Sequence, residues 1–167
     1  MTKKNLILST LGTLAMSAFA VSSATASSSG ALTLSGSVAA FNDIAVTPNG
    51  TNNTNLNIAA GESGKSVASV AETSNDLNGY KITMSSANGG QLQLAGNSAK
   101  YTTYQVSYNG GAYVTPPVSS APVTVKTVTS LSALATANSA IAVNVTAYPT
   151  ALAGTYSDTV TFTIVGN

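Results

Sequence analysis

The chain has 167 residues, of which only 7% are charged: six lysines, no arginine and five acids. It contains no histidine and no cysteine, which excludes Ser-His and Cys-His catalysis, imidazole and thiolate metal sites, and disulfides. The net charge of +1 offers no basic surface for nucleic acid or anionic lipid. We therefore expect a protein that is not an enzyme and that uses no cofactor or metal.

The first 26 residues have the features of a secretion signal. Lys3 and Lys4 form a short basic start, and the apolar stretch 6–20 is shorter than the roughly 20 apolar residues of a membrane span. Ala24-Thr25-Ala26 supplies the small-x-small pattern of a cleavage site, whereas Ala18-Phe19-Ala20, the competing site, leaves no polar spacer after the apolar run. Cleavage after Ala26 removes 26 of 167 residues and leaves 141, enough for one exported domain without a membrane span.

The segment 27–41 is predicted to be an N-terminal extension, and 42–167 the folded domain. Within the extension Leu32, Leu34, Val38 and Ala40 occupy every second position, with Gly36 among them. Period-2 alternation predicts a strand, and a strand at the free end of a secreted domain can pair with a neighbouring subunit. The alternative is an ordinary first strand that pairs within its own chain.

The rest of the chain alternates between short apolar-polar segments and turn signals such as Gly61-Glu62-Ser63-Gly64, Asn78-Gly79 and Asn109-Gly110-Gly111. Pro116-Pro117 excludes regular pairing at that point. The predicted strands are Ile44–Thr47, Val67–Glu72, Tyr80–Met84, Leu92–Leu94, Tyr104–Tyr108, Val123–Lys126, Ile141–Thr146 and a last strand that places Tyr156, Val160, Phe162 and Ile164 on one face.

Helical spacing occurs only at Leu131, Leu134, Ala135 and Asn138, which predicts a connecting turn or a short helix. Seven or more short strands in one small secreted domain indicate an all-β fold. The expected architecture is an immunoglobulin-like β-sandwich.

Three segments carry a resemblance to a known family. Ala31–Ala40 resembles the N-terminal extension of chaperone-usher pilus subunits, and Ala153–Ile164 resembles the closing strand of spore coat protein U-like domains from archaic pili. Thr73–Ile82 resembles such subunits more loosely. The chain departs from the family in having no cysteine for the disulfide of many members and in ending Val165-Gly166-Asn167, without a penultimate tyrosine.

The resemblance implies a structural subunit of a surface pilus that supports adhesion or biofilm formation. In that family the sandwich lacks its last strand, and a periplasmic chaperone fills the resulting groove until the extension of the next subunit replaces it at an outer-membrane usher. The donor residues would be Leu32, Leu34, Gly36, Val38 and Ala40. The acceptor groove would be bordered by Tyr156, Val160, Phe162 and Ile164.

Other functions compete with that of a fibre subunit. The five acids, Asp43, Glu62, Glu72, Asp76 and Asp158, are expected at strand ends and turns as solvated groups, since no pair has the aromatic setting of a glycosidase and their spacing matches no calcium loop. A self-complete module that binds carbohydrate or a surface is the main alternative. It would use Tyr101, Tyr104, Tyr108 and Tyr113, which could equally be core and cross-strand pairs.

Overall fold

The computed structural model describes residues 27–167, so the predicted signal with Ala24 and Ala26 lies outside the described part of the chain. The chain divides into two units, Met1–Ser37 and Val38–Asn167. From the first unit only 27–37 is described, and it has no helix or strand. The second unit contains all the strands described below.

Nine strands and no helix make up the described structure. Their bounds are β1 Asn42–Pro48, β2 Glu62–Ser74, β3 Tyr80–Ser86, β4 Gln91–Leu94, β5 Asn97–Tyr108, β6 Val123–Val128, β7 Ala135–Val145, β8 Tyr156–Ser157 and β9 Val160–Gly166.

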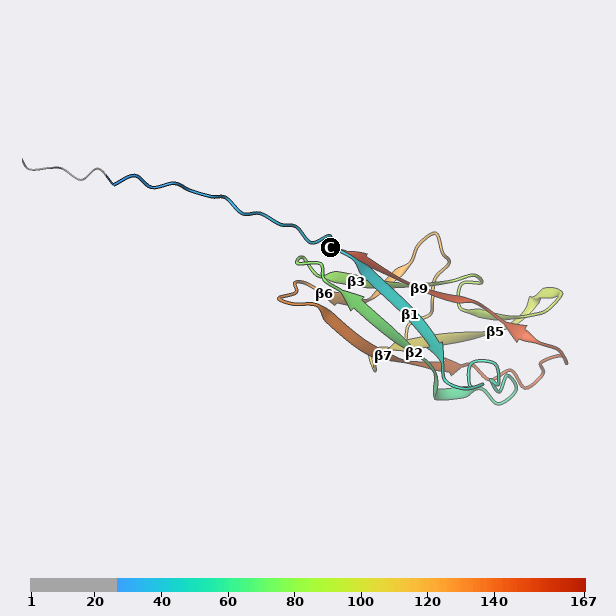
Figure 1. Ribbon diagram of the computed structural model, residues 1–167. Coiled ribbons are helices and arrows are strands. Elements are labelled where there is room, and N and C mark those ends of the chain that lie inside the picture. The colour runs from blue at the N-terminus through green and yellow to red at the C-terminus, as the bar shows by residue number, and fades with distance from the viewer. Residues whose placement is uncertain (1–26) are drawn as a thin grey trace, which may run out of the picture. The chain divides into compact units, whose positions relative to one another are not determined.

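These strands form two sheets (Figure 1). Six are ordered β1-β2-β7-β5-β4-β8 and three are ordered β6-β3-β9, and every pairing between named strands is antiparallel. The all-β prediction is confirmed, and the two facing sheets are consistent with a β-sandwich.

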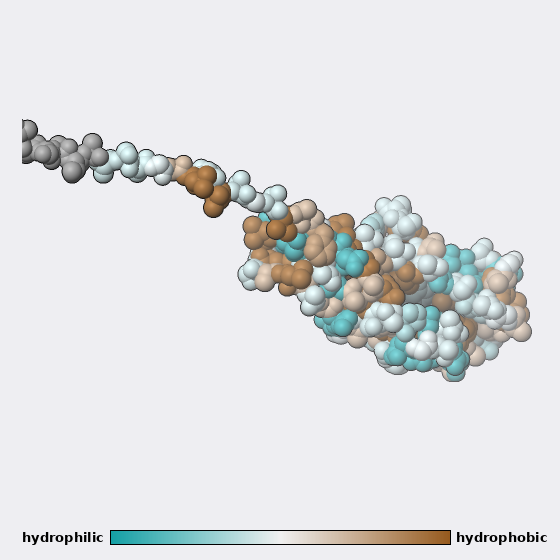
Figure 2. Space-filling model, viewed as in Figure 1, coloured by the Kyte–Doolittle hydropathy of each residue, from teal (hydrophilic) through white to brown (hydrophobic). Residues whose placement is uncertain are grey.

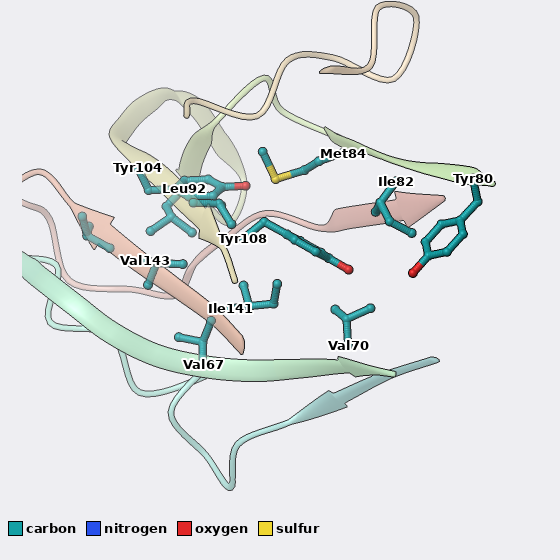
Figure 3. Close-up of a cluster of buried hydrophobic side chains, with 12 residues drawn as sticks. Val67, Val70, Tyr80, Ile82, Met84, Leu92, Tyr104, Tyr108, Ile141 and Val143 are labelled. Carbon is teal, nitrogen blue, oxygen red and sulfur yellow. The ribbon is translucent and has the colours of Figure 1, made fainter. Parts of the chain in front are cut away.

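The core lies between the sheets and is built from the alternation seen in the sequence (Figure 3). Val70 of β2 lies opposite Ile82 of β3, and these two residues and Met84 of β3 are fully buried. Ile141 of β7 and Tyr108 of β5 are buried in the same cluster. The central strands β2, β3, β5 and β7 therefore supply most of the packed interior.

The predicted last strand is wrong as a single element. Tyr156 belongs to β8, which pairs with β4 in the six-stranded sheet, whereas Val160, Phe162 and Ile164 belong to β9, which pairs with β3 in the other sheet. Asp158 and Thr159 lie between the two strands. The chain crosses from one sheet to the other there, and period-2 alternation cannot reveal such a crossing because Tyr156 stays in phase with β9.

Two further predictions need correction. The helical spacing around Leu131 does not form a helix: Ala135 and Asn138 lie in β7, and the residues before it form a bend. The glycine-rich segment at Gly61 is not simply a turn, because β2 already begins at Glu62. A register shift between Glu62 and Lys65 accommodates this segment as a bulge in the strand, and a second shift follows between Ser66 and Ala68.

Candidate functional site: the groove between β1 and β9

The strands β1 and β9 are edge strands that lie next to each other on the same side of the domain (Figure 1). Among the described strands β1 pairs only with β2, and β9 pairs only with β3, so each has one edge without a hydrogen-bonded partner strand. An unpaired edge presents a row of backbone donors and acceptors to any incoming strand. We call the space between these two strands the β1–β9 groove.

The inward side chains of both edge strands are incompletely covered. Val46 of β1 is 50% exposed, and Val160, Phe162 and Ile164 of β9 are only partly buried, in contrast to the fully buried Val70 and Ile82 of the central strands. Figure 2 shows apolar residues among polar ones on the face that β1 and β9 present. The apolar interior of the sandwich therefore reaches the surface along this groove.

A cavity of about 290 Å³ lies at one end of the β1–β9 groove. Val46, Pro48, Val160 and Phe162 contribute to its wall, and Leu56 of the loop after β1 adds to it. Its remaining walls include the buried core residues Val67, Leu92, Tyr104, Val106, Ile141, Val143 and Val145. Since a cavity of roughly 150 Å³ already accommodates benzene, this one has room for apolar side chains from outside the domain.

The groove narrows toward its other end. A Cβ added at Gly166 of β9 would lie 3.4 Å from Asn42 Nδ2 of β1, and it would clash with the Asp76 carboxylate. Asn42 Oδ1 is buried there without a hydrogen-bond partner. The opening is therefore at the end formed by Pro48 and Val160.

The predicted acceptor residues divide into two groups. Val160 and Phe162 line the cavity, and Ile164 packs against the core on the same strand. Tyr156 does not line the cavity: its ring packs edge-on against Tyr148 at 6.4 Å between centroids, and its hydroxyl donates to the Leu152 carbonyl oxygen at 3.1 Å. Sequence reasoning missed Val46 and Leu56, although the alternation of Ile44 and Val46 already indicated an apolar inner face of β1.

The predicted donor residues are all exposed. Leu32, Leu34 and Val38 are more than four-fifths exposed (83%, 84% and 88%), and a Cβ added at Gly36 would contact nothing. The segment Leu32–Ala40 forms no strand in the structure, so the expectation of an ordinary first strand paired within its own chain is not met.

Asn75 holds the base of the extension, the segment 39–41, to the domain. Its Oδ1 accepts from the Phe41 N–H at 2.7 Å, and its Nδ2 donates to the Ala39 carbonyl oxygen at 3.0 Å. The Asn75 N–H also donates to the Phe41 carbonyl oxygen at 3.3 Å. The compact unit therefore begins at Val38, before the first residue of β1. Ala40 is exposed, but its neighbours Ala39 and Phe41 are both hydrogen-bonded to their own domain.

The prediction that Glu72 is a solvated acid is wrong. Glu72 is 1% exposed. Its two carboxylate oxygens accept hydrogen bonds from residues of both sheets. The donors are Tyr80 Oη at 2.8 Å, Tyr108 Oη at 2.6 Å, Ser139 Oγ at 2.6 Å and Lys126 Nζ at 2.7 Å. We call these five residues the Glu72 network.

The Glu72 network keeps its carboxylate ionised in the core. Burial opposes the charge, but the hydrogen bonds from Lys126, Ser139 and the two tyrosines outweigh it and lower the pKa of Glu72. Burial and the Glu72 charge raise the pKa of Tyr80 to about 12, and for the same reasons the pKa of Tyr108 is raised. Both tyrosines therefore remain donors at physiological pH, and the network acts as a structural link between the sheets.

Two of the four tyrosines predicted for a carbohydrate site are not available to bind a sugar. Tyr104 and Tyr108 are buried, and Tyr104 Oη donates to Asp158 Oδ2 at 2.8 Å, so neither ring can stack on a sugar. Tyr101 and Tyr113 are the exposed members of the predicted set. Asp158 also accepts from the Asn88 N–H at 3.0 Å, which fixes the crossing between β8 and β9.

A comparison of the sequence with protein-family models and with curated proteins finds no significant match. Within residues 27–167, no group of three or more acids is placed to bind a metal ion. That part of the chain also has no helical segment with the length and apolar character of a membrane span.

Proposed function

We propose that this chain is a structural subunit of a bacterial surface fibre that polymerises by strand donation. In this proposal the domain is an immunoglobulin-like sandwich that lacks one strand. The β1–β9 groove of one subunit receives the extension of the next. The observation that carries the proposal is the apolar groove between two unpaired edges, in a chain whose own alternating extension is unpaired and exposed.

The lengths and chemistry of donor and groove agree. Asn75 holds Ala39, so the free alternating part of the extension is Leu32–Val38, seven residues that match the seven of β9. At strand rise this segment spans about 23 Å. The apolar side chains on one face of this segment would cover Val46, Val160 and Phe162, which are incompletely buried in the domain alone. We therefore place the donor strand at Leu32–Val38, without Ala40.

The expected stabilisation is large enough for a durable joint. Burying Leu32, Leu34 and Val38 contributes about 1.5 to 3 kcal/mol each, and ladder hydrogen bonds add about 0.5 to 1.5 kcal/mol each. The total is on the order of 10 kcal/mol before the cost of ordering the extension. A subunit with its groove empty would expose apolar surface and a free sheet edge, which favours aggregation. This is the reason to expect a periplasmic chaperone and an outer-membrane usher as partners, with export to the cell surface.

The test is a charge placed on the buried face of the donor strand. Leu34→Asp would carry an unpaired carboxylate into the groove, so we expect polymers to be lost while the exported subunit remains. Thr33→Asp is the matched control, because the same charge one residue earlier faces away from the groove. Electron microscopy and size-exclusion chromatography of both variants provide the measurement. Normal polymers from Leu34→Asp, or equal loss in both variants, would contradict strand donation.

A further inference from the structure

Three exposed apolar side chains lie together at the end of the domain where β1 begins. Antiparallel pairing joins Asn42 to Ser74 and Ser74 to Ala135 at this end of the sheet. Phe41, just before β1, and Leu134, just before β7, therefore lie on either side of Asn75, which follows β2. Leu77 lies close by, where its carbonyl oxygen accepts from the Leu131 N–H at 3.2 Å. Leu77 is 75% and Leu134 is 60% exposed, and Figure 2 shows apolar residues at this end. We call Phe41, Leu77 and Leu134 the apical cluster.

We propose that the apical cluster docks against the opposite end of a second copy of this chain, the surface around Pro48 and Leu152. This contact rests on the proposed function, since it forms only between subunits joined by strand donation. It adds a second surface to the joint, beyond the donor strand and its groove.

The short base of the extension requires the contact. Val38 is the last donor residue to enter a neighbour's groove, and Ala39, the next residue, is bound to Asn75 of its own domain. One residue spans only about 3.3 Å in extended chain, so the receiving subunit ends within a few ångströms of Ala39. Phe41 is held beside Asn75 by two hydrogen bonds, and it therefore lies at the joint together with the rest of the cluster.

The shape of the groove selects the surface that meets the apical cluster. The groove is open between Pro48 and Val160 and narrow between Asn42 and Gly166, so the domain attached to a donor strand has room only at the open end. The Tyr148 N–H donates to the Ile58 carbonyl oxygen at 2.9 Å, which brings the loop of Leu152 beside the loop after β1 at that end. Leu152 is 52% exposed there.

The resulting contact is head to tail. The apical cluster and the surface around Pro48 and Leu152 are different patches at opposite ends of one domain, separated by the 11-residue strand β7. When two subunits are joined through different patches, one apical cluster and one surface around Pro48 and Leu152 stay free at the two ends of the pair. Further subunits can therefore be added at both ends. A symmetric contact between two apical clusters would instead close a dimer.

The test uses cysteine pairs in the full chain, which has no cysteine of its own. The chain carrying both Leu134→Cys and Leu152→Cys should give a ladder of disulfide-linked multimers on a non-reducing gel after mild oxidation of assembled fibres. The two positions cannot bridge within one domain, because a disulfide needs Cα atoms within about 7 Å. Leu134→Cys combined with Thr124→Cys is the matched control, since Thr124 is exposed on the flank of β6 and should give no ladder.

Each outcome decides the proposal. A ladder from the Leu134→Cys and Leu152→Cys pair, and none from the control pair, supports the contact. Dimers from Leu134→Cys alone would show two apical clusters in contact and would overturn it. Fibres that form normally without any ladder would overturn the contact and leave strand donation intact. Failure of the unmodified chain to form fibres would overturn both proposals.

Discussion

Glu72 is the residue whose environment departs most from what its type suggests. A carboxylate with four donors and 1% exposure stabilises the fold only while its partners remain in place. Because Tyr80 and Lys126 come from the three-stranded sheet and Tyr108 and Ser139 from the other, the network fixes the two sheets relative to each other at one point.

We predict that Glu72→Gln lowers the free energy of unfolding by about 3 kcal/mol, since an amide cannot satisfy four donors and leaves Lys126 unpaired beside the core. Chemical denaturation at neutral pH measures the change. Glu62→Gln is the matched control on the same strand: Glu62 pairs with Lys65 near the surface, so little change is expected. Equal, small effects of the two substitutions would show that the network is not a structural link.

The lowered pKa of Glu72 also predicts a dependence of stability on pH. A carboxyl group whose folded pKa is below its unfolded value contributes stability at higher pH and loses it as pH falls through the folded pKa. The folded protein should therefore lose stability from about pH 4.5 downward, and Glu72→Gln should reduce this loss. Denaturation curves at pH 7 and pH 3 for both proteins measure it. An unchanged acid-dependent loss in the variant would assign the effect to other carboxylates.

Part of the Glu72 network could have been predicted from the sequence. Val70, Glu72 and Ser74 alternate in phase, so the apolar face of β2 carries an acid at an inward position. Lys126 could not be placed in this way. A register shift in the pairing of β3 with β6 makes Ile82 face Lys126 while Thr83 faces Thr124, and this bulge turns both Val125 and Lys126 toward the interior.

At the scale of elements, the turn between β2 and β3 depends on a close approach of two backbones. Gly79 has φ of 81°, and a Cβ there would clash with the Val128 carbonyl oxygen. Gly110 has a similar φ of 73° but no atom within contact distance of such a Cβ. Both positions need a left-handed backbone, and only the first also forbids a side chain.

We predict that Gly79→Ala destabilises the domain far more than Gly110→Ala. Strain at a positive φ costs about 1 to 2 kcal/mol in both variants, and displacement of the Val128 backbone adds to it only at Gly79. Thermal unfolding of the two variants measures the difference. Similar midpoints would show that the β2–β3 turn can move away from β6 without cost.

The existence of most strands was predictable because their apolar residues alternate over four or more positions, as in Tyr80–Met84 and Ile141–Val145. Two features could not be predicted from the local pattern, because they depend on which strands pair in the folded domain. The split between β8 and β9 depends on which neighbour each segment finds, β4 or β3. Ala135 and Asn138 form a strand because β2 offers them an edge, which overrides a helical spacing of four residues.

At the scale of the whole molecule, the proposed function depends on one property: whether the β1–β9 groove needs an outside strand. The two unpaired edges, the half-exposed Val46 of β1, the partly buried side chains of β9 and the cavity at Pro48 all belong to this groove. The sequence alone could suggest the donor residues from their alternation. It could not suggest the receiving surface, since Val46, Leu56 and Phe162 come from separate segments that meet only in the folded domain.

The most direct measurement compares the thermal midpoints of two chains. One spans 39–167 and keeps the hydrogen bond between Ala39 and Asn75. The other is the same chain with Leu32–Val38 appended after Asn167 through a flexible linker, which makes strand donation intramolecular. Filling the groove with several kcal/mol of apolar burial should raise the midpoint by at least about 10 °C and yield a monomer. The same appended strand with Leu34→Asp is the control and should give little gain. A well-folded monomer from 39–167, stabilised by no more than a few degrees by the intact strand, would show that the sandwich is complete without a donor.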